Sequence, residues 1–222
     1  MARLARVVLP NFPHHIIQRG NRRQDVFFCK DDYQYYLEQL KTQCQTEGID
    51  IWAYCLMTNH IHLIVRPDKK SNLSRAIGET HRNYTRMINF REKWRGYLWQ
   101  GRFSSFPLDE PWLLNALAYV ELNPVKAGMV ALPWEYSWSS VHAHLAGKDN
   151  LGIVDTSWLS KHLIADWKTY LLEALANNDK EFQQHERTGR PLGDDAFIKK
   201  AETLLGRCLM KKKPGPKPKK SQ

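Results

Sequence analysis

The sequence predicts an α+β fold of the ferredoxin-like, or split βαβ, type, in which an antiparallel sheet carries helices on one face. Segments with strand-like character alternate with segments whose apolar residues recur at helical spacing. Most of the links between these segments are short, as in a split βαβ unit. The length of 222 residues suits one domain of about 150 residues plus an extension.

The first half of the chain supplies most of the expected sheet. A strand over 14–18 leads into a polar, basic turn over 19–23, which reads RGNRR. Apolar residues at helical spacing then predict a helix that ends at Gly48. Strands at 50–57 and 60–66 follow, and the two residues between them predict a hairpin.

Three helices and one extended segment complete the predicted domain. A helix over about 72–93 carries one apolar stripe, and residues 97–107 look extended. The next helix begins after Asp109, with a proline in its first turn. We expect it to end near Asn123, because the proline that follows disfavours helical geometry in the residue before it. A short helix over 137–145 comes last.

The character of the chain changes after Gly147. We expect a first domain over 1–147 and a helical extension over 148–210 that is a candidate for DNA binding. The tail over 211–222 contains six lysines and three prolines and almost nothing apolar. Such a composition predicts a disordered segment.

The net charge of +10 is unevenly distributed along the chain. Residues 1–107 carry +8, residues 108–186 carry −6 and residues 187–222 carry +8. Two basic regions around an acidic one indicate a polyanionic partner, and nucleic acid is the usual one.

Other classes of protein fit the sequence less well. No apolar run is long enough to span a bilayer, and no charged-then-apolar leader is present, so we expect a soluble cytoplasmic protein. The cysteines form no CxxC pair, which predicts reduced thiols and neither a zinc site nor a disulfide framework.

The tripeptide His60-Ile61-His62 is a candidate metal site, because it lies in a predicted strand. Side chains alternate along a strand, so the two imidazoles share one face while Ile61 points to the other. Two adjacent imidazoles supply half of a metal site. Taken alone, such a pair is more often two surface histidines on a half-exposed strand.

The helix after Asp109 carries a polar stripe of Asn115, Tyr119 and Asn123, spaced four residues apart. The phenol of Tyr119 is a candidate nucleophile, and the amide of Asn123 is a candidate oxygen ligand for a metal. On spacing alone, Tyr119 fits a boundary tyrosine with its hydroxyl in water. Asn123 equally fits a C-terminal helix residue before proline.

Three further sets of residues are weaker candidates. His142 and His144 fall in a segment with helical period, where positions two apart diverge, so we expect surface histidines. His14 and His15 are adjacent on a strand and should face opposite ways. Tyr84 lies on the apolar stripe of its helix and is expected in the core.

The motifs resemble those of a known family. Residues 57–64, MTNHIHLI, resemble the metal-binding strand of the HUH single-strand nucleases, and residues 119–130, YVELNPVKAGMV, resemble the catalytic-tyrosine helix of their single-tyrosine transposase branch. The chain resembles the REP-associated tyrosine transposases, relatives of the transposases of the smallest bacterial insertion sequences. The other matching motifs are RGN at 19–21, LWQGRF at 98–103 and WSS at 138–140.

This resemblance implies a metal-dependent endonuclease that cleaves and rejoins single-stranded, hairpin (REP-like) DNA through a 5′-phosphotyrosine. Tyr119 would be the nucleophile, and a Mg²⁺ or Mn²⁺ ion would be held by His60, His62 and Asn123. Plain insertion-sequence relatives usually carry glutamine where this chain has asparagine, which points to the REP-associated branch.

The resemblance also guides the expected DNA contacts and assembly. Basic side chains in the turn after the first strand, in the LWQGRF motif and in the C-terminal extension should contact DNA, namely Arg19, Arg22, Arg23, Arg102, Arg187 and Arg190. We expect a nucleoid-associated bacterial protein that acts as a monomer, with a homodimer as the alternative.

Other functions remain open from the sequence. A non-catalytic module could bind single-stranded or hairpin DNA on a ferredoxin-like platform, which needs exposed aromatic residues on the sheet face. That function does not require Tyr119 and the histidine pair to converge. A replication initiator or relaxase, and a basic helix-turn-helix repressor, fit the motifs less well.

Overall fold

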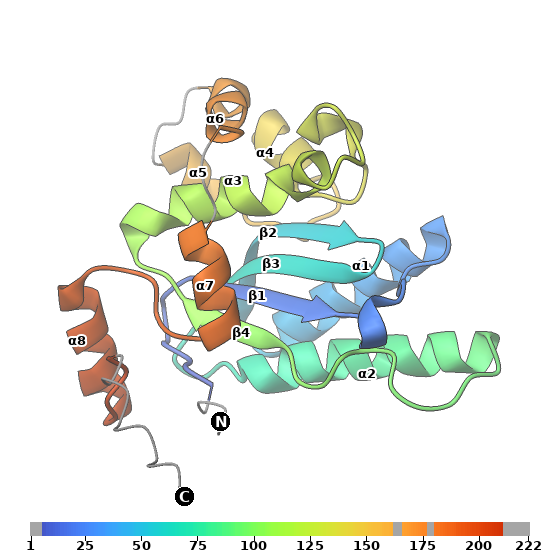
Figure 1. Cartoon of the computed structure of the whole chain (residues 1–222), viewed down its shortest axis with the longest axis horizontal. Helices are drawn as coiled ribbons and strands as arrows, with labels where there is room; N and C mark the ends of the chain where they lie inside the picture. The colour runs from blue at the N-terminus through green and yellow to red at the C-terminus, as the bar shows by residue number, and fades with distance from the viewer. Residues whose placement is uncertain (1–5, 162–165, 177–179, 211–222) are drawn as a thin grey trace, which may run out of the picture.

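Four antiparallel strands form the sheet at the centre of the protein (Figure 1). The computed structural model describes residues 6–161, 166–176 and 180–210, so the predicted disordered tail lies outside the described residues. The strand order β2-β3-β1-β4 is that of a split βαβ fold, which confirms the predicted fold class. The strands are β1 (His14–Arg19), β2 (Ile49–Met57), β3 (His60–Pro67) and β4 (Ser104–Pro107).

Helices cover both faces of this sheet, whereas the sequence predicted helices on one face only. The first core lies between the sheet and helices α1 (Lys30–Thr46) and α2 (Leu73–Arg91). The second core lies on the other face, where α3 (Glu110–Lys126) packs on β2 and β3. The difference arises because α3 is apolar around most of its surface, with nine buried residues, and so buries a second sheet face.

The C-terminal part of the chain packs against this domain. Helix α6 (Trp167–Ala174) contacts α3, and α7 (Lys180–Thr188) lies across β4 at one end of the sheet (Figure 1). Residues from α8 (Asp195–Leu205) form a third small core with the N-terminal segment. The remaining short elements are η1 (Asn21–Arg23), η2 (Pro133–Glu135), α4 (Val141–Ala146) and α5 (Ser157–Lys161).

Helix α3 begins as predicted but ends later than predicted. Asp109 caps it by accepting a hydrogen bond from the backbone N–H of Trp112. The helix continues through Pro124 to Lys126, so the predicted end near Asn123 is wrong. A proline removes only one helical N–H bond, and the bond from the N–H of residue 127 to the Asn123 carbonyl forms beyond it. Asn123 therefore stays one full turn beyond Tyr119 on the same helix.

A buried carboxylate fixes α3 to the helices outside it. Glu121 is fully buried and accepts hydrogen bonds from Ser140 Oγ (2.6 Å), His144 Nδ1 (2.6 Å) and Trp167 Nε1 (2.8 Å). Burial alone would lower the pKa of His144, but the nearby Glu121 charge raises it above its usual value. The prediction that His142 and His144 are both surface residues is therefore wrong for His144. A buried charge needs such a partner.

The turn after β1 is held against the β2–β3 hairpin. The N–H of Gly20 donates to the Asn59 carbonyl, and a Cβ at this glycine would lie 2.2 Å from the Gln24 carbonyl oxygen. Arg22 and Arg23 follow in the left-handed region, with φ values of 54° and 62°, and both are exposed. The close packing at Gly20 thus presents two arginines beside the histidine-bearing strand.

Within the residues that the structure describes, no helix has both the length and the apolar character needed to cross a membrane.

Candidate active site

The two histidines of the β3 tripeptide lie side by side on the sheet face that α3 covers. Their ring centroids are 5.0 Å apart, while Ile61 between them is fully buried in the core on the opposite face. His60 is partly buried and His62 is almost fully buried. The expected alternation along the strand therefore holds at this position.

The hydrogen bonds of the two rings leave matching nitrogens available for a metal ion. Nδ1 of His60 lies 2.6 Å from Oδ1 of Asn59, and Nδ1 of His62 lies 2.9 Å from Nε2 of His15. Nε2 of His62 is buried without a hydrogen-bond partner among the described residues. An orphaned buried nitrogen of this kind fits a metal ligand, because imidazole binds metals through one nitrogen while the other is held by a protein partner.

The electrostatic setting keeps these rings neutral, as metal binding requires. Burial, together with the charge of Arg19, lowers the pKa of His60 to about 3. Burial also lowers the pKa of His62 well below its usual value, and His15, His60 and Arg19 add to this effect. Burial alone lowers the pKa of His15 to about 3.

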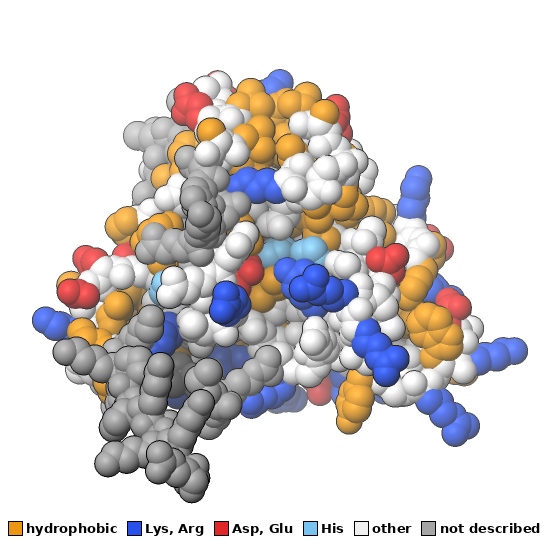
Figure 2. All heavy atoms as spheres, viewed as in Figure 1, with side chains coloured by type: hydrophobic (Ala, Val, Ile, Leu, Met, Phe, Trp, Pro, Cys, Tyr) orange, Lys and Arg blue, Asp and Glu red, His pale blue; other side chains and the backbone are white. Residues whose placement is uncertain are grey.

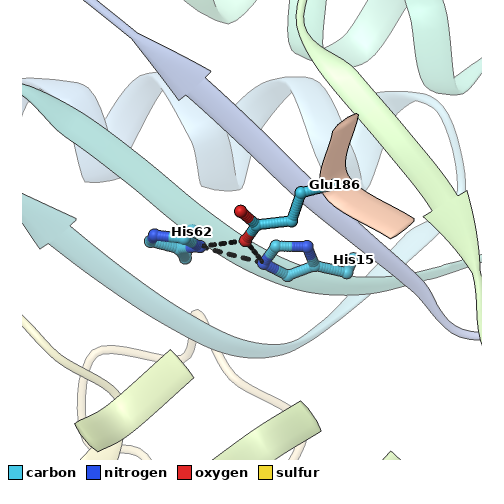
Figure 3. A group of neighbouring side chains, drawn as sticks. All are labelled: His15, His62 and Glu186. Atoms are coloured by element: carbon cyan, nitrogen blue, oxygen red, sulfur yellow. Dashed lines mark hydrogen bonds and ion pairs between the residues drawn. The ribbon is translucent and has the colours of Figure 1, made fainter. Parts of the chain in front are cut away.

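Two residues that the sequence analysis did not assign to the site, His15 and Glu186, complete the neighbourhood of His62 (Figure 3). Glu186, from α7, has a carboxylate oxygen 3.7 Å from Nδ1 of His62 and 3.9 Å from Nε2 of His15. The three atoms lie within 4.8 Å of one another and form a second set that could hold an ion. In Figure 3, Nε2 of His62 points away from Glu186 and His15.

Tyr119 faces this group from α3. Its ring centroid lies 5.7 Å from that of His62 and 5.9 Å from that of His15, both in edge-on geometry. The Tyr119 hydroxyl donates a hydrogen bond to Glu186 at 3.1 Å, and the ring of Phe182 lies 4.4 Å away. The tyrosine is only 8% exposed, so the solvated boundary position suggested by its spacing does not describe it.

Asn123 lies one turn further along α3 and lines the same pocket as Tyr119. Its side-chain N–H donates to the Tyr119 backbone carbonyl at 2.8 Å. This hydrogen bond uses the amide nitrogen and does not use the amide oxygen. The rival tyrosine, Tyr84, is fully buried and donates to the Val26 carbonyl, as expected for a core residue.

The pocket beside Tyr119 has a volume of about 850 Å³ and is predominantly basic. It is lined by four of the six arginines predicted to bind DNA, namely Arg19, Arg23, Arg102 and Arg187. Figure 2 shows histidine side chains at the centre of this face with Lys and Arg side chains directly below them. Of the other two, Arg22 is exposed on the neighbouring turn, and Arg190 donates to the Leu209 carbonyl.

Sequence reasoning missed His15 and Glu186 for different reasons. His15 pairs with Ile64 in the β1–β3 register, which places it on the face of His62, whereas His14 binds Phe12 and Leu9 on the other face. A correct register would have identified His15. Glu186 reaches the site through long-range packing of α7, and no local pattern signals it.

Comparison with known proteins places the chain in a class. The family model of IS200-like transposases matches residues 9–123, and the chain belongs to this family. A putative REP-associated tyrosine transposase of Haemophilus influenzae is 30% identical over an alignment of 113 positions, which covers 46% of this chain and 64% of that protein. The chain thus spans less than two thirds of that relative. The resemblance to this branch seen in the motifs is confirmed.

A solved structure supports the fold. The structure of a REP-associated tyrosine transposase bound to a REP hairpin matches 71% of this chain and 91% of its own chain, with a TM-score of 0.58 and 20% identity. At this level of identity the match shows a shared fold.

Proposed function

We propose that the protein is a metal-dependent endonuclease and transposase that cleaves and rejoins single-stranded hairpin DNA of the REP kind through a 5′-phosphotyrosine. The observation that carries this proposal is the position of Tyr119, which lies beside His62 and lines a basic pocket together with Asn123. Family membership supports DNA processing, and the hairpin bound in the solved relative supports this substrate class.

The proposed metal ligands are Nε2 of His60 and Nε2 of His62, with the amide oxygen of Asn123 as the third. Mixed nitrogen and oxygen ligation suits Mn²⁺ or Mg²⁺. When bound, such an ion supplies Lewis-acid stabilisation of the charge on the scissile phosphate. We favour this set over His15, His62 and Glu186, because the hydrogen bond between His15 and His62 already uses one nitrogen of each.

Tyr119 is the proposed nucleophile. Its oxygen attacks phosphorus and the bond to the 3′ oxygen breaks, which leaves a 5′-phosphotyrosine and a free 3′-hydroxyl. The Tyr119 hydroxyl donates its hydrogen bond to Glu186, and this bond orients the attacking oxygen. The arginines that line the pocket hold the phosphates of the strand near this oxygen. Covalent retention of the phosphate makes rejoining possible without ATP.

A covalent-adduct assay tests this function. The purified protein is incubated with a labelled hairpin that carries single-stranded flanks, with Mn²⁺ or with EDTA, and is run on a denaturing gel. We expect a shifted protein–DNA band that requires Mn²⁺. If hairpins that bind the protein give no band with Mn²⁺ or Mg²⁺, the catalytic proposal is wrong and a non-catalytic binding module replaces it. That alternative is less well supported, because helices cover both sheet faces.

The hydrogen bond from His15 predicts a measurable effect on metal affinity. Replacing His15 with alanine should weaken Mn²⁺ binding by about 10- to 100-fold, because outer partners orient metal-binding imidazoles. Isothermal titration calorimetry measures this, and His14→Gln on the opposite strand face is the matched control. Glu186→Gln should leave Mn²⁺ affinity nearly unchanged. A large loss in that variant would instead place the ion between His15, His62 and Glu186.

A further inference from the structure

A groove adjoins the basic pocket beside Tyr119, which is the proposed catalytic pocket. It has a volume of about 560 Å³ and lies between α2 and the loop over 96–103. Gln18 and Arg102 line both this groove and the catalytic pocket, so the two hollows share a wall. A strand that passes through the catalytic pocket can therefore continue into the groove without crossing the protein core.

The lining of the groove is basic and contains no acidic side chain among the described residues. Its cations are Arg6, Arg82, Arg86 and Arg102. Arg82 is paired with Glu79, whereas burial and the nearby charge of Arg102 lower the pKa of Arg6 to about 10. Crowded guanidinium groups of this kind attract phosphate.

Aromatic side chains line the groove together with these cations. Tyr97, at the rim, is 88% exposed, so the face of its ring is open to a ligand. Deeper in, Trp99 is 6% exposed, and its indole Nε1 has no hydrogen-bond partner among the described residues. His81 lies 4.6 Å from the Trp99 ring. The groove thus offers a stacking surface at its rim, while the indole nitrogen of Trp99 is buried.

The loop that bears these residues is fixed to the sheet. The N–H of Asn21 donates to the Leu98 carbonyl, and the N–H of Gln100 donates to the Arg19 carbonyl. Gly20 and Trp99 form an antiparallel bridge between these two bonds. The groove is therefore held in register with β1 and does not depend on a ligand for its shape.

We propose that this groove binds the unpaired nucleotides that adjoin the cleavage site, with a base stacked on Tyr97 and phosphates bound by Arg86 and Arg102. The proposal rests on the proposed function, because it assigns the groove to the same DNA strand. A positively charged groove with interleaved aromatic side chains is the general design for single-strand binding. Continuity with the catalytic pocket favours a nucleotide occupant over a peptide.

The test measures binding in EDTA, without cleavage, by fluorescence anisotropy. The probes are a hairpin alone, the same hairpin with a short single-stranded extension, and that extension with abasic sites. We expect Tyr97→Ala to weaken binding of the extended hairpin by about 5- to 150-fold, the effect of one lost base–aromatic stack. It should leave the bare hairpin and the abasic probe unchanged. Arg86→Gln should lower the salt slope on the extended probe by about 1.

Phe90→Ala is the matched control, because Phe90 is 89% exposed at the end of α2 and does not line the groove. This variant should bind all three probes like the unmodified protein. Equal binding by Tyr97→Ala and the unmodified protein would overturn the proposal, and so would an equal loss on the bare hairpin. If the adduct assay fails but the protein still binds the extension through Tyr97, the catalytic proposal is wrong and the groove proposal stands.

Discussion

Tyr119→Phe should abolish the covalent DNA adduct while the protein remains folded and still binds hairpin DNA. The substitution removes one oxygen, which is the proposed nucleophile, and keeps the ring that packs against Phe182 and His62. The lost hydrogen bond to Glu186 should cost only about 1 kcal/mol of folding stability. The measurement is the denaturing-gel assay with Mn²⁺, alongside an anisotropy titration of the same hairpin.

Tyr170→Phe provides the matched control for this experiment. Tyr170 also donates its hydroxyl hydrogen bond to a residue of α3, Asn115, but this bond lies outside the catalytic pocket. We expect this variant to form the adduct at the normal rate. If the adduct persists in Tyr119→Phe, another nucleophile performs the reaction and the assignment of Tyr119 is wrong.

Glu121→Ala should lower the free energy of unfolding by about 3–5 kcal/mol, because it breaks a buried ion pair and leaves its partners unsatisfied. The donors left behind are the hydroxyl of Ser140, the ring of His144 and the indole of Trp167. Urea denaturation followed by circular dichroism measures the loss.

Two further variants distinguish the contribution of the buried ion pair to stability from the effect of replacing any glutamate. Glu173→Ala removes an exposed carboxylate on α6 and should change stability by less than about 0.5 kcal/mol. Glu121→Gln keeps the shape of the side chain and some of its hydrogen bonds. Its loss of unfolding free energy should lie between those of Glu173→Ala and Glu121→Ala. A loss below about 1 kcal/mol in Glu121→Ala would show that the buried pair contributes little to stability.

The sheet could be predicted from the sequence largely because strand alternation is a local signal. The hairpin between β2 and β3 follows from two strand-like, largely apolar runs with a two-residue link, and the register brings Met57 opposite His60. The packing of α3 on the second face of the sheet could not be predicted, because the sequence of α3 does not show which apolar surface it will contact. His144 was misplaced for the same reason, because its partner Glu121 lies on another helix.

The candidate site was predictable where its residues lie within one element. The shared face of His60 and His62 follows from the strand period, and the stripe of Tyr119 and Asn123 follows from the helix period. That Tyr119 faces His62 is a tertiary fact, which the family motifs implied and the spacing did not. The ligand role of Asn123 remains a prediction.

The anchoring of α3 keeps the proposed nucleophile and the histidine beside it in one polypeptide. Glu121 ties the tyrosine helix to Ser140, His144 and Trp167 of its own chain, and Tyr119 lies beside His62 of that chain. Under the proposed mechanism one polypeptide therefore stores a single 5′ end at a time. Exchange between two ends must proceed by successive turnovers of one tyrosine or by a meeting of two loaded molecules.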